Sequence, residues 1–249
     1  MAGHSKWAKV KHFKGAIDAK RARIFAKLSR EITVAAKVGG GDPERNPRLR
    51  MALLKCRSAN MPSDNIERAV KKGTGELEGV TYEEVTYEAY GPGGAALLIE
   101  ATTDNANRTV AEIRNAFQRH GGNLGATNSV AWMFDRKAQI TVDATRADED
   151  TVMEAALDAG ADDMARDGDV FLITGPAGQV HQISERLKAK KIAVQAAEIA
   201  LIPKSTVKVD GKDAKHLLAL IEALEEMDDV AKVSSNFDID AEALAAATA

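Results

Sequence analysis

The apolar residues in the first part of the chain follow the spacing of α-helices. Between residues 16 and 38 they recur every three or four positions, which predicts one long helix that ends at the glycines of residues 39–41. A second helix is predicted after Pro47 and a third from Pro62 to Gly73, because proline suits the first helical turn. Three helices joined by short loops predict a small helical bundle.

In the rest of the chain, segments of period two alternate with helical segments. Alternating apolar residues around a glycine–proline turn predict a β-hairpin over residues 85–102, followed by a helix to about residue 120 and a strand at 130–134. Residues 138–199 show the order strand, helix, two strands, helix, strand, which is typical of ferredoxin-like folds. From residue 200 onward the chain returns to a strand at 205–209, a helix at 214–227 and a strand at 230–237.

Half of a sheet before the ferredoxin-like segment and half after it indicate an insertion. We therefore expect an α+β multidomain protein, with an N-terminal three-helix bundle followed by two α/β ferredoxin-like domains, one inserted in the other. The predicted domains are a basic helical domain at 1–80, a discontinuous α/β domain at 81–137 and 200–239, and an inserted ferredoxin-like domain at 138–199.

Charge is distributed unevenly along the 249 residues, although the net charge is only −3. The first 80 residues contain 18 lysines and arginines against 8 acids, whereas the remainder contains 16 against 29. Such asymmetry is typical of a nucleic-acid-binding module attached to a more acidic body. The alternative is a basic domain that docks on the acidic domains of its own chain.

Several cations of the first predicted helix fall on one stripe, offset from its apolar face: Lys20, Arg23, Lys27, Arg30 and Lys37. A stripe of cations at this pitch can follow a phosphate backbone. The alternative is an ordinary solvated face, but few acids accompany these cations. Secondary candidates in the second predicted helix are Arg48, Arg50 and Lys55.

The residues ahead of the first helix combine cations with an aromatic ring. The candidate contacts to nucleic acid in this arm are Lys6, Trp7, Lys9, Lys11 and Lys14. The lysines could bind phosphate and the indole could stack on an exposed base. The alternative is a tail without a binding role.

Signals for catalysis are weak. Cys56 lies on the apolar side of its helix, which favours packing over nucleophilic chemistry. The five histidines are scattered, and neither zinc-protease, nucleophile-elbow nor phosphate-loop patterns occur. The sequence therefore predicts a non-enzymatic protein without catalytic residues, metal site or cofactor. A polar cluster at residues 102–109 is explained by helix capping, although Asn107 and Arg108 are candidates for a ligand-binding surface.

The single cysteine fits a reducing compartment. No apolar run approaches the roughly 20 residues that a membrane helix needs, and the first residues lack the apolar segment of a secretory signal. We therefore expect a cytoplasmic protein that does not act at a membrane.

Many segments, in one order along the chain, resemble the YebC/PmpR family of bacterial regulatory proteins, which includes a mitochondrial translational activator. The matching stretches are residues 1–7, 18–21, 24–25, 46–50, 60–62, 65–69, 90–94, 103–105, 107–109 and 120–125. Ala22-Arg23 stands where the family usually shows Gly-Lys, which keeps the cation. The resemblance implies one helical and two α/β domains, and no catalytic residues.

Three functions remain open from the sequence. The first is a probable DNA-binding transcriptional regulator, which the resemblance implies and the charge asymmetry supports. The second is a ribosome-associated translation factor that binds ribosomal or other RNA, favoured by the lack of a helix-turn-helix pattern with a clear base-reading face. The third is a protein-interaction adaptor whose basic domain recognises an acidic protein.

Overall fold

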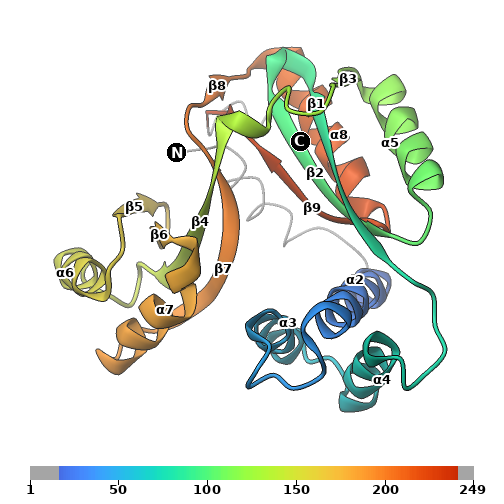
Figure 1. Cartoon of the computed structure of the whole chain (residues 1–249). Coiled ribbons are helices and arrows are strands. Elements are labelled where there is room, and N and C mark those ends of the chain that lie inside the picture. The colour runs from blue at the N-terminus through green and yellow to red at the C-terminus, as the bar shows by residue number, and fades with distance from the viewer. Residues whose placement is uncertain (1–16, 241–249) are drawn as a thin grey trace.

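The computed structural model describes residues 17–240, with side chains from Arg21 onward, as three bodies (Figure 1). The helical body consists of α2 (Ile17–Gly39), α3 (Pro47–Ser58) and α4 (Ser63–Thr74). The side chain of Asn46 accepts the N–H of Leu49 and caps α3. Gly73 lets α4 approach α2 closely, because a Cβ there would lie 2.4 Å from the carbonyl oxygen of Thr33.

The outer body pairs a four-stranded antiparallel sheet with two helices on one face. Its strands have the order β3-β1-β2-β9, and the bounds are β1 (Glu83–Tyr90), β2 (Ala96–Thr103), β3 (Asn123–Leu124) and β9 (Val230–Ser235). The helices are α5 (Ala106–His120) and α8 (Gly211–Glu226), and their apolar faces close the largest core of the protein. A short parallel pair, β8 (Val207–Lys208) with β10 (Phe237–Asp238), lies beside it.

The inserted body has the ferredoxin-like order of elements. They are β4 (Phe134–Asp143), α6 (Glu149–Ala159), β5 (Asp163–Asp167), β6 (Val170–Pro176), α7 (Val180–Ala189) and β7 (Val194–Pro203). The strands pair antiparallel in the order β5-β6-β4-β7, and both helices share one core with the sheet. The predicted fold class is confirmed: a helical bundle precedes two α/β bodies, and one is inserted in the other. The domain limits given above stay a prediction.

The strand predicted at residues 130–134 is wrong over most of its length. Residues Ala131–Met133 form a 3-10 turn, η2, and the strand that follows begins only at Phe134. The reason is the buried carboxylate of Glu88, which accepts the backbone N–H groups of this loop. Those N–H groups are therefore not available to a neighbouring strand.

Two of the predicted C-terminal strands are shorter than expected. The segment at 205–209 pairs only over β8, and the segment at 230–237 divides into β9 and β10. The break falls at the buried Asn236, whose Oδ1 accepts the backbone N–H of Ala96 at 2.7 Å. Two further 3-10 turns are η1 (Pro92–Gly94) and η3 (Ala177–Gln179).

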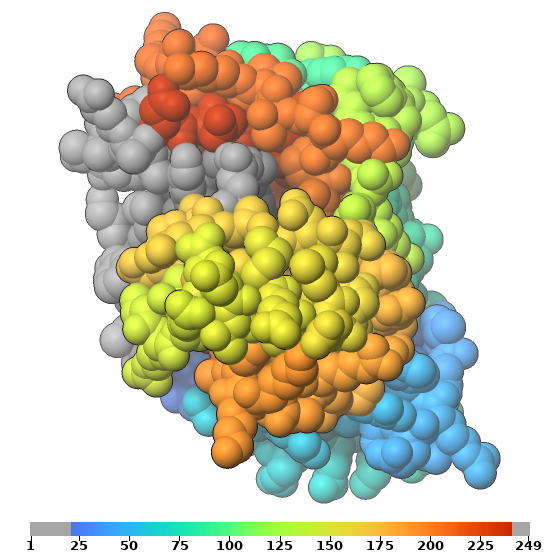
Figure 2. Space-filling view, turned by 90° about the vertical axis from the view of Figure 1, so that its left-hand side faces the viewer, coloured from blue at the N-terminus to red at the C-terminus, as the bar shows by residue number. Residues whose placement is uncertain are grey.

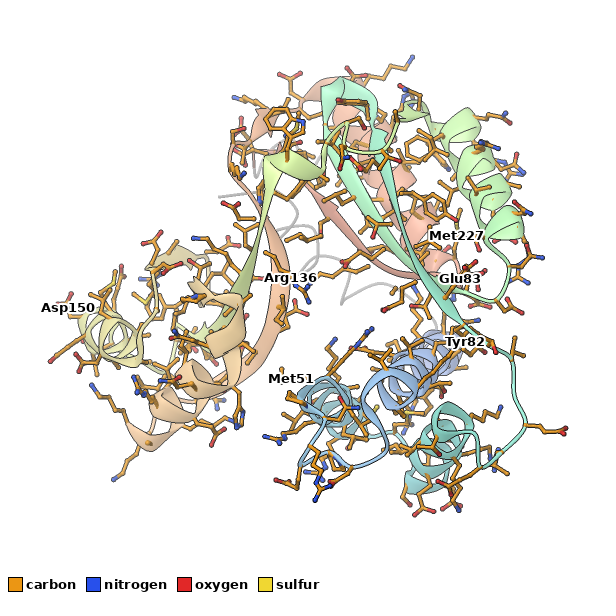
Figure 3. The ribbon with its side chains drawn as sticks, viewed as in Figure 1. Met51, Tyr82, Glu83, Arg136, Asp150 and Met227 are labelled. Atoms are coloured by element: carbon orange, nitrogen blue, oxygen red, sulfur yellow. The ribbon has the colours of Figure 1, made fainter. Side chains whose placement is uncertain are left out.

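The three bodies contact one another. The second face of the outer sheet packs through Ala96 and Leu98 on Val130 and Phe134, at the start of the inserted body. Met51, on the side of α3 that faces the inserted body, packs against the core of that body (Figure 3). In Figure 2 the inserted body, yellow to orange, lies in front, with the helical body in blue below it and the outer body above it. Within residues 17–240, none of the helices is both long enough and apolar enough to cross a bilayer.

Candidate nucleic-acid interface

Five residues of the predicted interface precede the part of the chain that the structure describes. Lys6, Trp7, Lys9, Lys11 and Lys14 lie outside the described residues. Lys20 belongs to the first turn of α2, but its side chain is also outside the described part. These residues stay a prediction.

Three described cations of the α2 stripe face the C-terminal end of α8. Nη1 of Arg23 lies 3.1 Å from Oε1 of Glu226, and Nζ of Lys27 donates to the carbonyl oxygen of Glu225 at 2.7 Å. Arg30 donates to the carbonyl oxygen of Asp228 and lies 3.7 Å from the Asp229 carboxylate. The final carbonyls of a helix carry partial negative charge, so this end attracts cations even without its acids.

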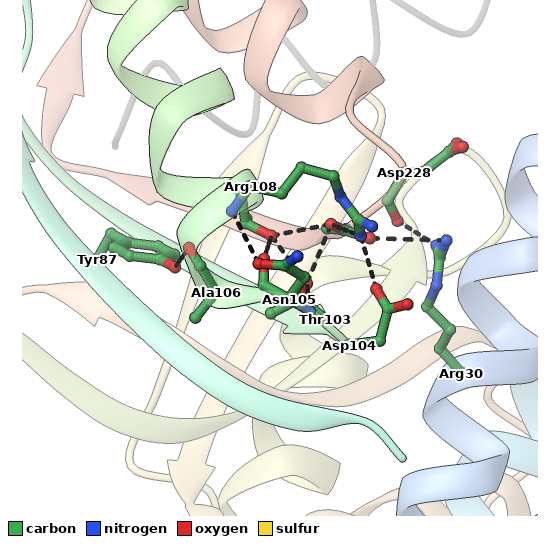
Figure 4. Close-up of polar contacts among 10 residues, drawn as sticks. Arg30, Tyr87, Thr103, Asp104, Asn105, Ala106, Arg108 and Asp228 are labelled. Carbon is green, nitrogen blue, oxygen red and sulfur yellow. Dashed lines mark hydrogen bonds and ion pairs between the residues drawn. The ribbon is translucent and has the colours of Figure 1, made fainter. Parts of the chain in front are cut away.

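Asp229 is the centre of a buried polar cluster at this end of α8. Figure 4 shows Arg108 and Thr103 of this cluster, with Asp104 and Arg30 beside them. Its Oδ2 accepts hydrogen bonds from Arg108 Nη2 at 2.7 Å and from the hydroxyls of Thr103 and Thr109 at 3.1 and 2.8 Å. Burial raises the pKa of Asp229, but these hydrogen bonds outweigh it and hold the pKa below its ordinary value. The cluster therefore keeps a carboxylate anion in place under α5.

The cluster gives Arg108 a structural role within the chain. Its guanidinium also bonds the Asp104 carboxylate at 2.6 Å, and both partners raise its pKa further above an already high value. Asn105 caps α5 by accepting the N–H of Arg108. Asn107 is exposed at the same helix start. Both predicted ligand-surface residues are exposed, but Arg108 is bonded to Asp104 and Asp229. Asn107 is the one whose side chain has no hydrogen-bond partner among the described residues.

The secondary candidates on α3 also have partners within the chain. Arg48 forms a two-pronged ion pair with Glu84 on β1, and the hydrogen bond that it donates to the Glu84 carboxylate raises the pKa of Arg48. Arg50 donates to two backbone carbonyls of the preceding loop, and Lys55 pairs with Glu31 of α2 at 2.7 Å. Their side chains remain between one third and one half exposed, so phosphate can still reach them.

The structure adds cations that the sequence interpretation did not single out. Among the described residues, exposed cations without an ion pair in the helical body are Arg21, Lys37, Arg57, Arg68, Lys71 and Lys72. Three of these belong to α4: Lys71 and Lys72 follow Arg68 by three and four positions, which places them on the same face of the helix as Arg68. Lys37 and Lys72 line the same hollow between α2, α4 and the linker at 75–82. The spacing of the α4 cations was a visible signal in the sequence.

Cys56 is fully buried in the helical core, where burial raises the pKa of its thiol to about 11. The thiol is therefore protonated near neutral pH and is a poor nucleophile. Across residues 17–240, no group of three or more His, Cys, Asp or Glu side chains is arranged to hold a metal ion.

The described parts define a class of protein: a helical body with an exposed basic surface, followed by two α/β bodies of which one is inserted in the other. Residues 5–76 match the sequence profile of the TACO1/YebC protein N-terminal domain, and residues 82–237 match that of the TACO1/YebC second and third domain. The chain belongs to the TACO1/YebC family.

Relatives cover nearly the whole chain. A protein of Gemmatimonas aurantiaca named "Probable transcriptional regulatory protein" is 56% identical over 98% of this chain and 99% of its own length. A protein of Treponema denticola with the same name is 54% identical over 96% of this chain and 97% of its own length. The crystal structure of a conserved hypothetical protein from Aquifex aeolicus is similar, with a TM-score of 0.84 and 45% identity over 91% of this chain and 94% of that chain.

Proposed function

We propose that this chain is a regulator of gene expression that binds nucleic acid through its helical body, as a DNA-binding transcriptional regulator in the cytoplasm. The observation that carries the proposal is the set of exposed, unpaired cations on α4 and its neighbours, on a body whose first 80 residues hold more than twice as many cations as acids. The names of the relatives, which call those proteins probable transcriptional regulators, support the same reading.

The proposed contact is to the phosphate backbone. Each phosphate that a lysine or arginine neutralises releases counterions, so affinity falls steeply with salt. Phosphate contacts fix position but carry no sequence information. Base recognition would then fall to other side chains, of which Trp7 in the N-terminal arm is the candidate.

A ribosome-associated role on RNA is the second candidate. The exposed acids Asp64 and Glu67 lie among the cations of α4, so this helix has no clear face of arginine and amide side chains of the kind that reads base edges in the major groove. A surface of this composition suits recognition of backbone shape, which is how structured RNA is bound. A protein-interaction adaptor is the third candidate, because the same cations would also fit an acidic protein.

The first test reverses charge on α4. The double variant Lys71→Glu, Lys72→Glu is compared with Lys212→Glu, Lys215→Glu, which makes the same charge change at exposed positions on α8. Affinity for a short DNA duplex and for RNA of the same sequence is measured over a range of salt. We expect the α4 variant to lose at least about tenfold in affinity and to show a smaller salt slope, with the α8 control near the wild type.

Equal affinity of the two variants would contradict the proposal. Crosslinking in living cells, followed by sequencing, then separates the alternatives. Enrichment of promoter DNA supports the transcriptional role, and ribosomal RNA concentrated at a few positions supports the translational one. If neither DNA nor RNA crosslinks, and heparin does not displace a protein bound to the helical body, the adaptor role is supported.

A further inference from the structure

The acceptors at the end of α8 follow the cation stripe of α2 residue by residue. Arg23, Lys27 and Arg30 stand at helical spacings of four and three, and each reaches an anionic carboxylate or a helix-end carbonyl of residues 225–229. A row of negative oxygens along such a stripe is what a phosphate backbone would also offer. The end of α8 thus occupies three of the described cations that the sequence assigns to nucleic acid, Arg23, Lys27 and Arg30.

From this juxtaposition we infer that residues 225–229 are an intramolecular competitor for nucleic acid, and that the α2 stripe binds phosphate only after the helical body leaves α8. The inference rests on the proposed function. It adds a closed state, in which the cations on α4 are open to phosphate while Arg23, Lys27 and Arg30 on α2 are occupied by residues 225–229.

The outer part of this contact is weak. Arg23 and Glu226 keep 38% and 56% of their side-chain surface exposed, and exposed ion pairs of this kind hold weakly. The apolar cores of the helical body and the outer body are separate clusters, so no described apolar cluster joins α2 to α8. Beside this contact a polar hollow lies between the two bodies. It is lined by Arg23 and Arg30 of the helical body, and by Arg108 and several acids of the outer body. Interfaces of this polar kind permit domain motion.

Residues 225–229 keep their structure when the helical body leaves them. Asp229 remains bonded to Arg108, Thr103 and Thr109, which all belong to the outer body. Its carbonyl oxygen also accepts the backbone N–H of Thr102 at 2.7 Å. Departure of Arg30 therefore leaves no unsatisfied buried carboxylate, and opening avoids that large desolvation cost.

Competition has a defined consequence for affinity. When only a fraction of molecules is open, the apparent dissociation constant for a ligand of the open state rises by the inverse of that fraction. A change that weakens the closed state alone must tighten binding. Linkage also requires that nucleic acid, once bound to α2, promotes release of α8.

The test is Glu226→Lys in the full chain, with Glu222→Lys as the matched control. Both replace an exposed glutamate of α8 by lysine, but only Glu226 pairs with the α2 stripe. Affinity for a short single-stranded RNA and a short DNA duplex is measured for both variants and the wild type. We expect Glu226→Lys to bind about threefold or more tightly than Glu222→Lys, because a new like-charge contact with Arg23 adds to the loss of the ion pair.

A second readout follows the competitor directly. Hydrogen exchange of the amides at residues 225–230 should speed up in the wild type when the bound probe saturates it, while those of α2 slow down. Equal affinities for the two variants, or exchange at residues 225–230 that the probe leaves unchanged, would overturn the inference. If the Lys71→Glu, Lys72→Glu variant still loses affinity, the proposed function survives that failure. If neither the wild type nor any variant binds the RNA or the DNA probe, both the proposed function and this inference are contradicted.

Discussion

The carboxylate of Glu88 accepts the backbone N–H of Val130 at 2.7 Å, although Glu88 is only 8% exposed. Two more N–H groups of the same loop, from Asn128 and Ala131, point at its oxygens at 2.6 and 2.8 Å. One side chain on β1 therefore fixes the segment that leads from the outer body into the inserted one.

The first prediction concerns this carboxylate. Glu88→Gln replaces an oxygen acceptor by an amide donor that faces N–H groups, so we expect the free energy of unfolding to fall by about 1–3 kcal/mol. Denaturant unfolding measures it, and Glu83→Gln, at an exposed position of the same strand, is the control. An unchanged midpoint for Glu88→Gln would show that the loop does not depend on the carboxylate.

The same residue predicts a dependence on pH. Burial raises the pKa of Glu88, but the backbone hydrogen bonds outweigh it and leave the pKa below the ordinary value of 4.5. A carboxylate with a lowered pKa stabilises the folded state above that ordinary value, and the contribution is lost as pH falls through the lower, folded pKa. We expect Glu88→Gln to lose less stability than the wild type on acidification from pH about 6 to about 3. Parallel pH curves would contradict this.

The second prediction concerns the contact of α4 with α2. Gly73→Ala would place a Cβ 2.4 Å from the Thr33 carbonyl oxygen and 2.7 Å from the Ala36 Cβ. The backbone of α2 at Thr33 can move aside only by disturbing its helix. We therefore expect the free energy of unfolding to fall by about 1–3 kcal/mol. Gly178→Ala, where a Cβ meets nothing within 4 Å, is the control and should be near neutral. A tolerant Gly73→Ala would mean that the helices separate at little cost.

The third prediction uses Cys56, the single cysteine of the chain. Its thiol is buried in the helical core and its pKa is raised to about 11. A thiol reagent should therefore react slowly in native buffer and rapidly once urea unfolds the helical body. Fast native labelling would indicate that this core opens without global unfolding.

The fourth prediction concerns Asp229. Asp229→Asn keeps the shape but removes the anion that Arg108 and two threonine hydroxyls face. We expect a loss of about 2 kcal/mol in the free energy of unfolding, because buried groups lose a charged partner. Asp228→Asn is the control, because Asp228 is exposed and accepts the hydrogen bond from Arg30 with its backbone carbonyl and not with its carboxylate. We expect the free energy of unfolding of this control to be unchanged. Similar losses in both variants would remove the special role of the buried anion.

Local signals determined most of the fold in advance. Glycines, prolines and apolar periodicity located the three helices of the helical body, and the order of strands and helices identified the ferredoxin-like insert with its antiparallel sheet. These features depend on side chains close together in the chain. The interruption at residues 131–133 could not be predicted in this way, because its cause is Glu88, more than forty positions earlier.

The surface divides in the same way. The sequence by itself determined that cations concentrate in the first 80 residues and that five of them form a stripe on the first helix. Only the tertiary structure decided that three members of this stripe, Arg23, Lys27 and Arg30, face residues 225–229, about two hundred positions away, and that the cations of α4 stay open. Helical spacing sets which side chains share a face, but the acceptor that covers a face comes from long-range packing, which no local pattern encodes.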